Sequence, residues 1–324
     1  NPPKPKDKRV GRGFSPDNPY AYQYHWYNNT QRENVAFLER LRVLLDRYPD
    51  AAALGEISSE DSLATTAEYV TDQRLHMGYS FELLTENGSA AYIRATVERL
   101  EAAMVEGWPC WAVSNHDVQR AVTRWGNGDA SAALAAQLVA LVCSLRGSVC
   151  LYQGEELGLP EADVPYEALQ DPYGKTFWPN FKGRDGCRTP MPWNGGDHAG
   201  FTDGHPWLPI PAEHRAISVA KQDADPSSVL NTVRRFLAWR KTQPALQVGA
   251  IRFLDAPEPV LAFRRDAEGH AVLAVFNLSA QPVDWQVPGG LALQAIEGHG
   301  LAAATLVGER LSLPPRGVYY ARIV

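Results

Sequence analysis

The chain has 324 residues, of which 45% are hydrophobic and 21% charged, a composition typical of globular proteins. Its formal net charge of −6 gives no indication of a nucleic-acid partner or of an anionic membrane surface. No apolar run approaches the roughly 20 residues that a membrane-spanning helix needs, so we expect neither kind of partner.

The four cysteines show no CxxC pair and no Cys/His spacing typical of a metal site. They are Cys110, Cys143, Cys150 and Cys187. Cys143 and Cys150 lie in apolar surroundings, where buried free thiols are common. We therefore expect no disulfide framework and a reducing compartment, the cytoplasm.

The first twenty residues, NPPKPKDKRVGRGFSPDNPY, lack an initial Met and are rich in proline and basic side chains. They contain no apolar segment of the kind found in a signal peptide. This composition is typical of the middle of a loop, and we expect the chain to begin inside a larger gene product.

Strands and helices are predicted to alternate along the first half of the chain. A helix within residues 31–50, with apolar positions at helical spacing, is followed by a short apolar run at 51–57. Further helices are predicted at 60–70, 90–105 and 130–146, and further strands near 79–84, 110–114 and 148–152. This order favours a parallel sheet with helical crossovers, either an open doubly wound sheet or part of a (β/α)8 barrel.

The pattern changes twice in the second half. Residues 158–228 are rich in Pro, Gly and Trp and too long for a plain connection, which indicates a functional or wrapping loop. A helix is predicted at 228–244, and short alternating runs from about residue 250 predict a small all-β domain. We therefore divide the chain into an α/β domain, 1–246, and a β-sandwich-like domain, 247–324.

Acidic side chains follow three of the predicted strands. Glu56 ends the first strand, Asn115-His116-Asp117 ends the third, and Glu155-Glu156 follow the fourth. Catalytic groups of parallel α/β folds lie at the carboxyl ends of strands, so Glu56 and Asp117 are the candidate catalytic pair. Two carboxylates at one site suit acid–base catalysis and the stabilisation of cationic intermediates.

His116 beside Asp117 also suggests a metal-dependent hydrolase, since both side chains bind divalent ions. No second histidine follows a matching strand end, so we expect no metal site here. A second alternative is a catalytically inactive barrel that serves as a scaffold for a partner. The polar residues at the strand ends argue against it, because a scaffold does not need them.

Four segments in order, LGEISSED (54–61), AVSNHDVQR (112–120), LYQGEELG (151–158) and GRDGCRTPMPW (183–193), together resemble the α-amylase superfamily of glycoside hydrolases. They are most similar to its α-glucosidase and oligo-1,6-glucosidase branch. The stretch at 11–30 further resembles bacterial enzymes that hydrolyse short α-glucosides and transfer glucose to acceptor hydroxyls. These small molecules are the substrates and acceptors that we expect.

The resemblance implies roles for four residues. Glu56 resembles the proton donor to the glycosidic oxygen, and Asp117 resembles the carboxylate that binds glucose hydroxyls and supports the oxocarbenium-like transition state. His116 resembles a donor to the same sugar. Arg188 resembles the arginine that closes the glucose pocket.

The resemblance also implies a missing part. The chain is similar only to strands five to eight of the family's TIM barrel, followed by the small all-β domain. The nucleophilic Asp, in an Arg-x-Asp segment on the fourth strand, has no match. The acidic candidates before Glu56 are Asp7, Asp17, Asp46 and Asp50.

Four strands cannot close a barrel and leave two long edges. We therefore expect an N-terminal polypeptide of the same enzyme to supply the nucleophile and any structural calcium. Without it, the chain is expected neither to catalyse nor to fold well.

Overall fold

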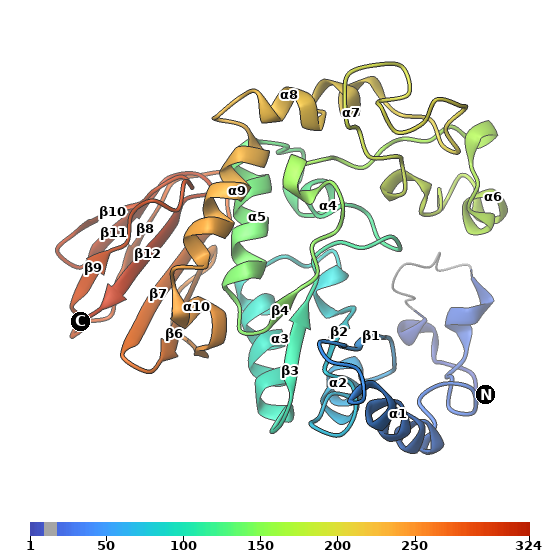
Figure 1. Cartoon of the computed structure of the whole chain (residues 1–324), viewed down its shortest axis with the longest axis horizontal. Helices are drawn as coiled ribbons and strands as arrows, with labels where there is room; N and C mark the ends of the chain where they lie inside the picture. Colours follow the sequence, from blue (N-terminus) through green and yellow to red (C-terminus); the bar gives the residue numbers. More distant parts are fainter. Residues whose placement is uncertain (10–17) are drawn as a thin grey trace.

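The first half of the chain forms a four-stranded parallel sheet with helices packed beside it (Figure 1). The computed structural model describes residues 1–9 and 18–324. The strands occur in the order β1 (Leu54–Ile57), β2 (Met77–Ser80), β3 (Trp108–Trp111) and β4 (Ser148–Val149). All three pairings are parallel, which confirms the predicted sheet. Within the described residues, β1 and β4 each pair on one side only, so the sheet is open.

Five helices accompany the sheet, and three of them begin at side chains that cap their first turns. The five helices are α1 (Arg32–Leu45), α2 (Ser62–Tyr69), α3 (Ala90–Ala103), α4 (Ala121–Gly126) and α5 (Ala132–Ser144). Asp61 accepts the Ala64 N–H at the start of α2, and Ser89 and Ser131 cap α3 and α5 in the same way. The four helices predicted for the first half of the chain are confirmed as α1, α2, α3 and α5, with ends shifted by a few residues, whereas the short helix α4 was not predicted.

The predicted strand at 79–84 is wrong in its second half. β2 ends at Ser80, and Glu82–Leu84 form a 3-10 turn, η3. The Glu82 N–H bonds to the Ser80 hydroxyl and the Leu84 N–H to the Phe81 carbonyl, so the backbone turns away from the sheet. β3 and β4 also end earlier than predicted, at Trp111 and Val149.

Residues 158–228 lie at the carboxyl ends of the strands (Figure 1). This segment contains the short helices α6 (Pro172–Phe177), α7 (Ala212–Ala216) and α8 (Val219–Asp223). The helix predicted within 228–244, ending before Pro244, is α9 (Val229–Arg240), and a short helix that was not predicted, α10 (Pro244–Val248), follows it. Proline suits the first position of α10, because that position needs no N–H donor. None of the helices in the described ranges is long and apolar enough to cross a membrane.

The C-terminal part is all-β, as predicted. Five strands pair in the order β5 (Ala250–Phe253), β6 (Val260–Ala267), β7 (His270–Asn277), β12 (Val318–Ile323) and β9 (Leu293–Ala295). Three more pair in the order β10 (Thr305–Val307), β11 (Arg310–Leu313) and β8 (Val283–Gln286). The sequence gives no strong signal for β9 to β11, which have only three or four residues each.

Both faces of the five-stranded sheet are buried. Along β6, Val260 and Ala262 contribute to a core with the three-stranded sheet, while Leu261 and Phe263 belong to the core formed by the helices. This two-sided burial explains why β6 and β7 are almost continuously apolar. The β-rich part thus shares one hydrophobic core with α5 and α9.

Arg265 of β6 lies at this junction and is fully buried. Its guanidinium donates to the carbonyl oxygens of Ser144 (2.6 Å), Leu145 (2.8 Å) and Gly249 (2.8 Å). The Ser144 and Leu145 carbonyls lie at the end of α5, and the Gly249 carbonyl follows α10. One side chain therefore donates hydrogen bonds to carbonyl oxygens at the ends of two helices.

Replacing Arg265 with Met is expected to lower the free energy of unfolding by about 3 kcal/mol or more, because buried carbonyls lose their donors. The matched control is Arg264→Met, which removes a partly exposed pair with Asp266 and is expected to cost less than about 1 kcal/mol. Urea unfolding of both variants checks this. Equal losses would show that Arg265 has no special role.

Candidate active site

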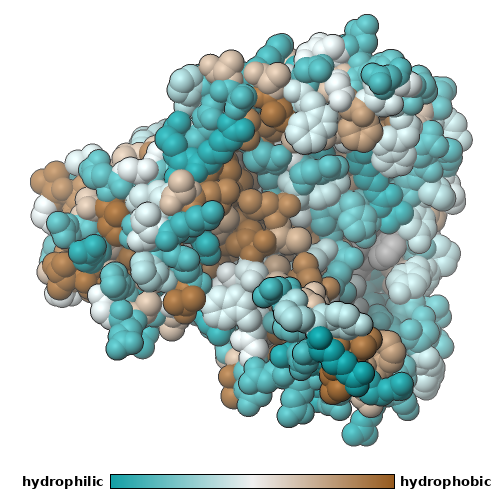
Figure 2. Space-filling view, viewed as in Figure 1, coloured by the Kyte–Doolittle hydropathy of each residue, from teal (hydrophilic) through white to brown (hydrophobic). Residues whose placement is uncertain are grey.

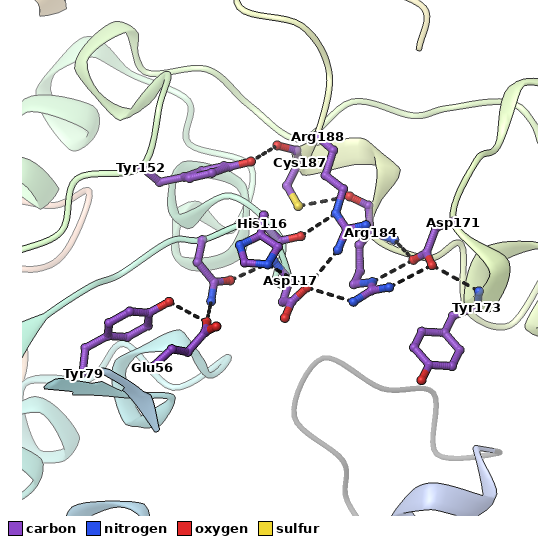
Figure 3. A network of polar contacts seen from close by, with 11 residues as sticks. Glu56, Tyr79, His116, Asp117, Tyr152, Asp171, Tyr173, Arg184, Cys187 and Arg188 are labelled. Atoms are coloured by element: carbon purple, nitrogen blue, oxygen red, sulfur yellow. Dashed lines mark hydrogen bonds and ion pairs between the residues drawn. The ribbon is translucent and has the colours of Figure 1, made fainter. Parts of the chain in front are cut away.

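Glu56, the predicted proton donor, lies in β1 near the carboxyl edge of the sheet. Its Oε1 accepts a hydrogen bond from the Tyr79 hydroxyl at 2.5 Å and another from the Asn115 amide at 3.1 Å (Figure 3). Tyr79 is the direct neighbour of Glu56 in β2. Burial and the bond to Glu56 raise the pKa of the Tyr79 hydroxyl well above its usual range, so that it remains a donor.

Asn115 connects the two predicted catalytic carboxylates. Its amide donates to Glu56, and its carbonyl oxygen accepts the backbone N–H of Asp117 at 2.9 Å. The side chain is buried, so both contacts are shielded from water. Asn115 therefore fixes the position of the Asp117 backbone relative to the Glu56 carboxylate.

Asp117 is the centre of a charged cluster. Its Oδ1 lies 2.8 Å from Arg188, 2.9 Å from Arg184 and 3.6 Å from the His116 ring (Figure 3). Two guanidinium groups on one oxygen fix the carboxylate by charge-assisted hydrogen bonds.

His116 and Arg188 are linked to each other as well. The Arg188 Nε donates to the His116 carbonyl oxygen at 2.7 Å, while the imidazole itself is 55% exposed. The structure therefore brings all four predicted site residues into one network.

The sequence analysis missed two members of this network, Arg184 and Asp171. Arg184 lies in the GRDGCRTPMPW motif, but that motif contains two arginines and gives no means of ranking them. Asp171, which pairs with Arg184 at 2.9 Å, lies outside every motif identified.

A cavity of about 930 Å³ opens beside Asp117 and Arg184. Its walls come from the segments at 84–87, 117–119, 161–164 and 181–184 of this chain. Glu161 lies in this wall, and burial raises its pKa to about 7 against the opposing effects of the Arg120 N–H and guanidinium. Such a cavity is large enough for a small organic molecule.

The aromatic residues of the 158–228 segment and the acidic residues before Glu56 are spread widely. Phe181 lines the cavity, whereas Trp178 packs against Tyr166 with the two rings tilted, and Trp193 is half exposed. Asp46 pairs with Arg42 at the end of α1. Residues 11–17 of the 11–30 stretch, and with them Asp17, lie outside the described residues.

No group of three or more His, Cys, Asp or Glu side chains in the described part of the chain could hold a metal ion. The cysteines are all unpaired, and three of them, Cys110, Cys143 and Cys187, are buried.

Residues 7–249 match the family described as alpha amylase, catalytic domain, and residues 251–320 match the maltogenic amylase C-terminal domain. The whole chain is 44% identical to a probable alpha-glucosidase of Rhizobium meliloti and covers 59% of it. It superimposes on the alpha-glucosyl transfer enzyme XgtA with a TM-score of 0.97 and 64% identity, over 60% of that protein.

A more distant similarity is to the trehalulose synthase MutB from Pseudomonas mesoacidophila, with a TM-score of 0.80 and 25% identity. The match covers 91% of this chain and 59% of the synthase. The chain thus spans about 60% of the length of these relatives. Because the catalytic-domain match alone extends over most of its residues, the chain belongs to the α-amylase family.

Proposed function

We propose that this chain is part of a retaining α-glucosidase that hydrolyses short α-glucosides and transfers α-glucosyl groups to acceptor hydroxyls. The observation that carries the proposal is the single network that joins Glu56, Asp117, His116 and Arg188. Two carboxylates within one network are what glycoside cleavage through an oxocarbenium-like transition state needs. The relatives named as glucosidases and as a glucosyl transfer enzyme support the same reaction class.

In the proposed mechanism, Glu56 protonates the glycosidic oxygen as the bond to the leaving group breaks. Asp117 hydrogen-bonds the sugar hydroxyls and stabilises the positive charge that develops at the ring. His116 and Arg188 donate to the same glucose. Glu56 then acts as base, taking a proton from water in hydrolysis or from an acceptor hydroxyl in transfer.

A retaining reaction also needs a nucleophile about 5 Å from the acid, to form the covalent glucosyl-enzyme. We propose that this carboxylate lies outside the chain, on an N-terminal polypeptide of the same enzyme. The chain would then contribute strands five to eight of a barrel from residues 1–246 and the C-terminal β domain from 247–324. The edges of β1 and β4, which pair with no further strand in residues 1–9 and 18–324, support this proposal.

Glu56→Gln tests the assignment of the acid in the active enzyme that contains this chain. The expected result is a fall in kcat/KM for maltose of about 100-fold to 10,000-fold, because protonation of the leaving oxygen is lost. The fall for p-nitrophenyl α-glucoside should be much smaller, since that leaving group needs no proton. The control is Glu60→Gln, which removes the ion pair of the half-exposed Glu60 with Lys4 and should change neither value.

An equal loss on both substrates would contradict the role of Glu56 as acid. Unchanged turnover in the Gln variant would favour the inactive scaffold instead.

The position of the nucleophile is tested by trapping. A 2-deoxy-2-fluoro-α-glucosyl fluoride should label one carboxylate, because fluorine slows breakdown of the glucosyl-enzyme. Peptide mass spectrometry should locate the label on a polypeptide segment outside residues 1–324. A label on any Asp or Glu of this chain would refute that part of the proposal.

Metal removal separates the proposal from a metal-dependent hydrolase built on His116 and Asp117. The enzyme is expected to keep most of its turnover after treatment with EDTA, because proton transfer by Glu56 needs no ion. Turnover that is lost to EDTA and restored by Zn²⁺ but not by Ca²⁺ would support the metal-dependent reaction.

A further inference from the structure

We propose that Asp171 is a positioning residue, which orients Arg184 so that Arg184 fixes the Asp117 carboxylate for contact with the sugar. This inference rests on the proposed function and adds two members to the same site. It depends on contacts that lie entirely within the described part of this chain.

Asp171 holds the guanidinium plane of Arg184. The Arg184 Nε donates to Asp171 Oδ2 at 2.9 Å, and one terminal nitrogen donates to Oδ1 at 3.0 Å (Figure 3). The Asp171 side chain is fully buried. A bidentate pair of this kind fixes the direction of the remaining guanidinium nitrogen, which a lysine ammonium could not do.

That remaining nitrogen of Arg184 donates to Asp117 Oδ1 at 2.9 Å. Arg188 donates to the same oxygen at 2.8 Å. Among the described residues, no polar group bonds to the second oxygen of Asp117, Oδ2. Two donors on one oxygen thus orient the carboxylate and leave Oδ2 as the acceptor for a sugar hydroxyl.

Asp171 is itself firmly held. Its backbone N–H and that of Gln170 donate to Asp185 Oδ2, at 2.8 and 2.6 Å. Its own carboxylate caps the first turn of α6 through the Tyr173 N–H. Burial would raise the pKa of Asp171, but the hydrogen bonds from Arg184 and Tyr173 outweigh it and lower the pKa below its usual value.

The backbone around this pair has no room for side chains. Gly183 has a φ of +79°, and a Cβ there would lie 2.8 Å from the Gly174 Cα and 3.0 Å from Asp171 Oδ2. A Cβ on Gly174 would lie 2.5 Å from the Lys182 carbonyl oxygen. Two glycines therefore let the Lys182–Arg184 segment approach α6 closely enough for the pair to form.

The test is Asp171→Asn in the active enzyme that contains this chain. Asn offers one carbonyl oxygen where Asp171 accepts four N–H groups, and its own N–H groups would face those donors. We expect kcat/KM for maltose to fall by about 10-fold to 100-fold, mainly in kcat, because Asp117 is misaligned. Asp197→Asn, which removes an exposed pair with Arg215 elsewhere in the 158–228 segment, is the control and should change kcat/KM less than about twofold.

A double-mutant cycle separates positioning from loop stability. In an Arg184→Met background, Asp171→Asn should cost less than about twofold, because the residue through which Asp171 acts is gone. The same loss in both backgrounds would mean that Asp171 merely supports the loop, and would overturn the proposal. If Arg184→Met does not fold, Arg184→Lys replaces it, since Lys cannot form the bidentate pair.

A crystal structure of the Asp171→Asn variant gives a readout that does not depend on activity. The distance from Arg184 to Asp117 Oδ1 is expected to exceed about 3.5 Å, the limit of a hydrogen bond. An unchanged contact would overturn the inference. A wild-type enzyme inactive on α-glucosides would instead refute the proposed function, so the two failures are distinguishable.

Discussion

Two arginine side chains of the 158–228 segment meet at one oxygen of Asp117, and the rest of the site is arranged around that contact. The parallel sheet supplies the place, because its strands end at a common edge. The positive charges that pair with Asp117 come from the 158–228 segment, which folds over that edge and so places Arg184 and Arg188 beside the carboxylate. Figure 2 shows a mixed surface, with apolar residues near the middle of the visible face and polar residues around them.

Strand spacing and one buried amide relate the positions of the two acids. Neighbouring strands lie about 4.8 Å apart; Glu56 lies in β1 and Asp117 in the loop that follows β3, with β2 between these two strands. Tyr79 of β2 fills the intervening position and bonds to Glu56. The Asn115 side chain, which follows β3, reaches Glu56 of β1 and also accepts the Asp117 N–H. The sheet and this buried amide together relate the positions of the two carboxylates.

The sequence predicts those features of the site that follow from short-range pattern. Apolar periodicity identifies α3 and α5, and a carboxylate after a buried run marks Glu56 and Asp117. Arg184 and Asp171 could not be identified in this way, because their partners lie far along the chain and no local period relates them. For η3 the contacts are local, but residues 81–84 are apolar enough to continue β2, and the apolar pattern does not indicate that the Ser80 hydroxyl accepts the Glu82 N–H and ends the strand.

The five-stranded sheet has no solvent-facing side, since helices cover one face and the smaller sheet covers the other. A sheet buried in this manner is not an appendage that can be exchanged between relatives as a unit. Its residues Phe263, Phe276 and Tyr320 belong to the same hydrophobic core as residues of α5 and α9. A chimaera that joins this catalytic part to another member's β domain would therefore have to transplant the facing surfaces of both helices.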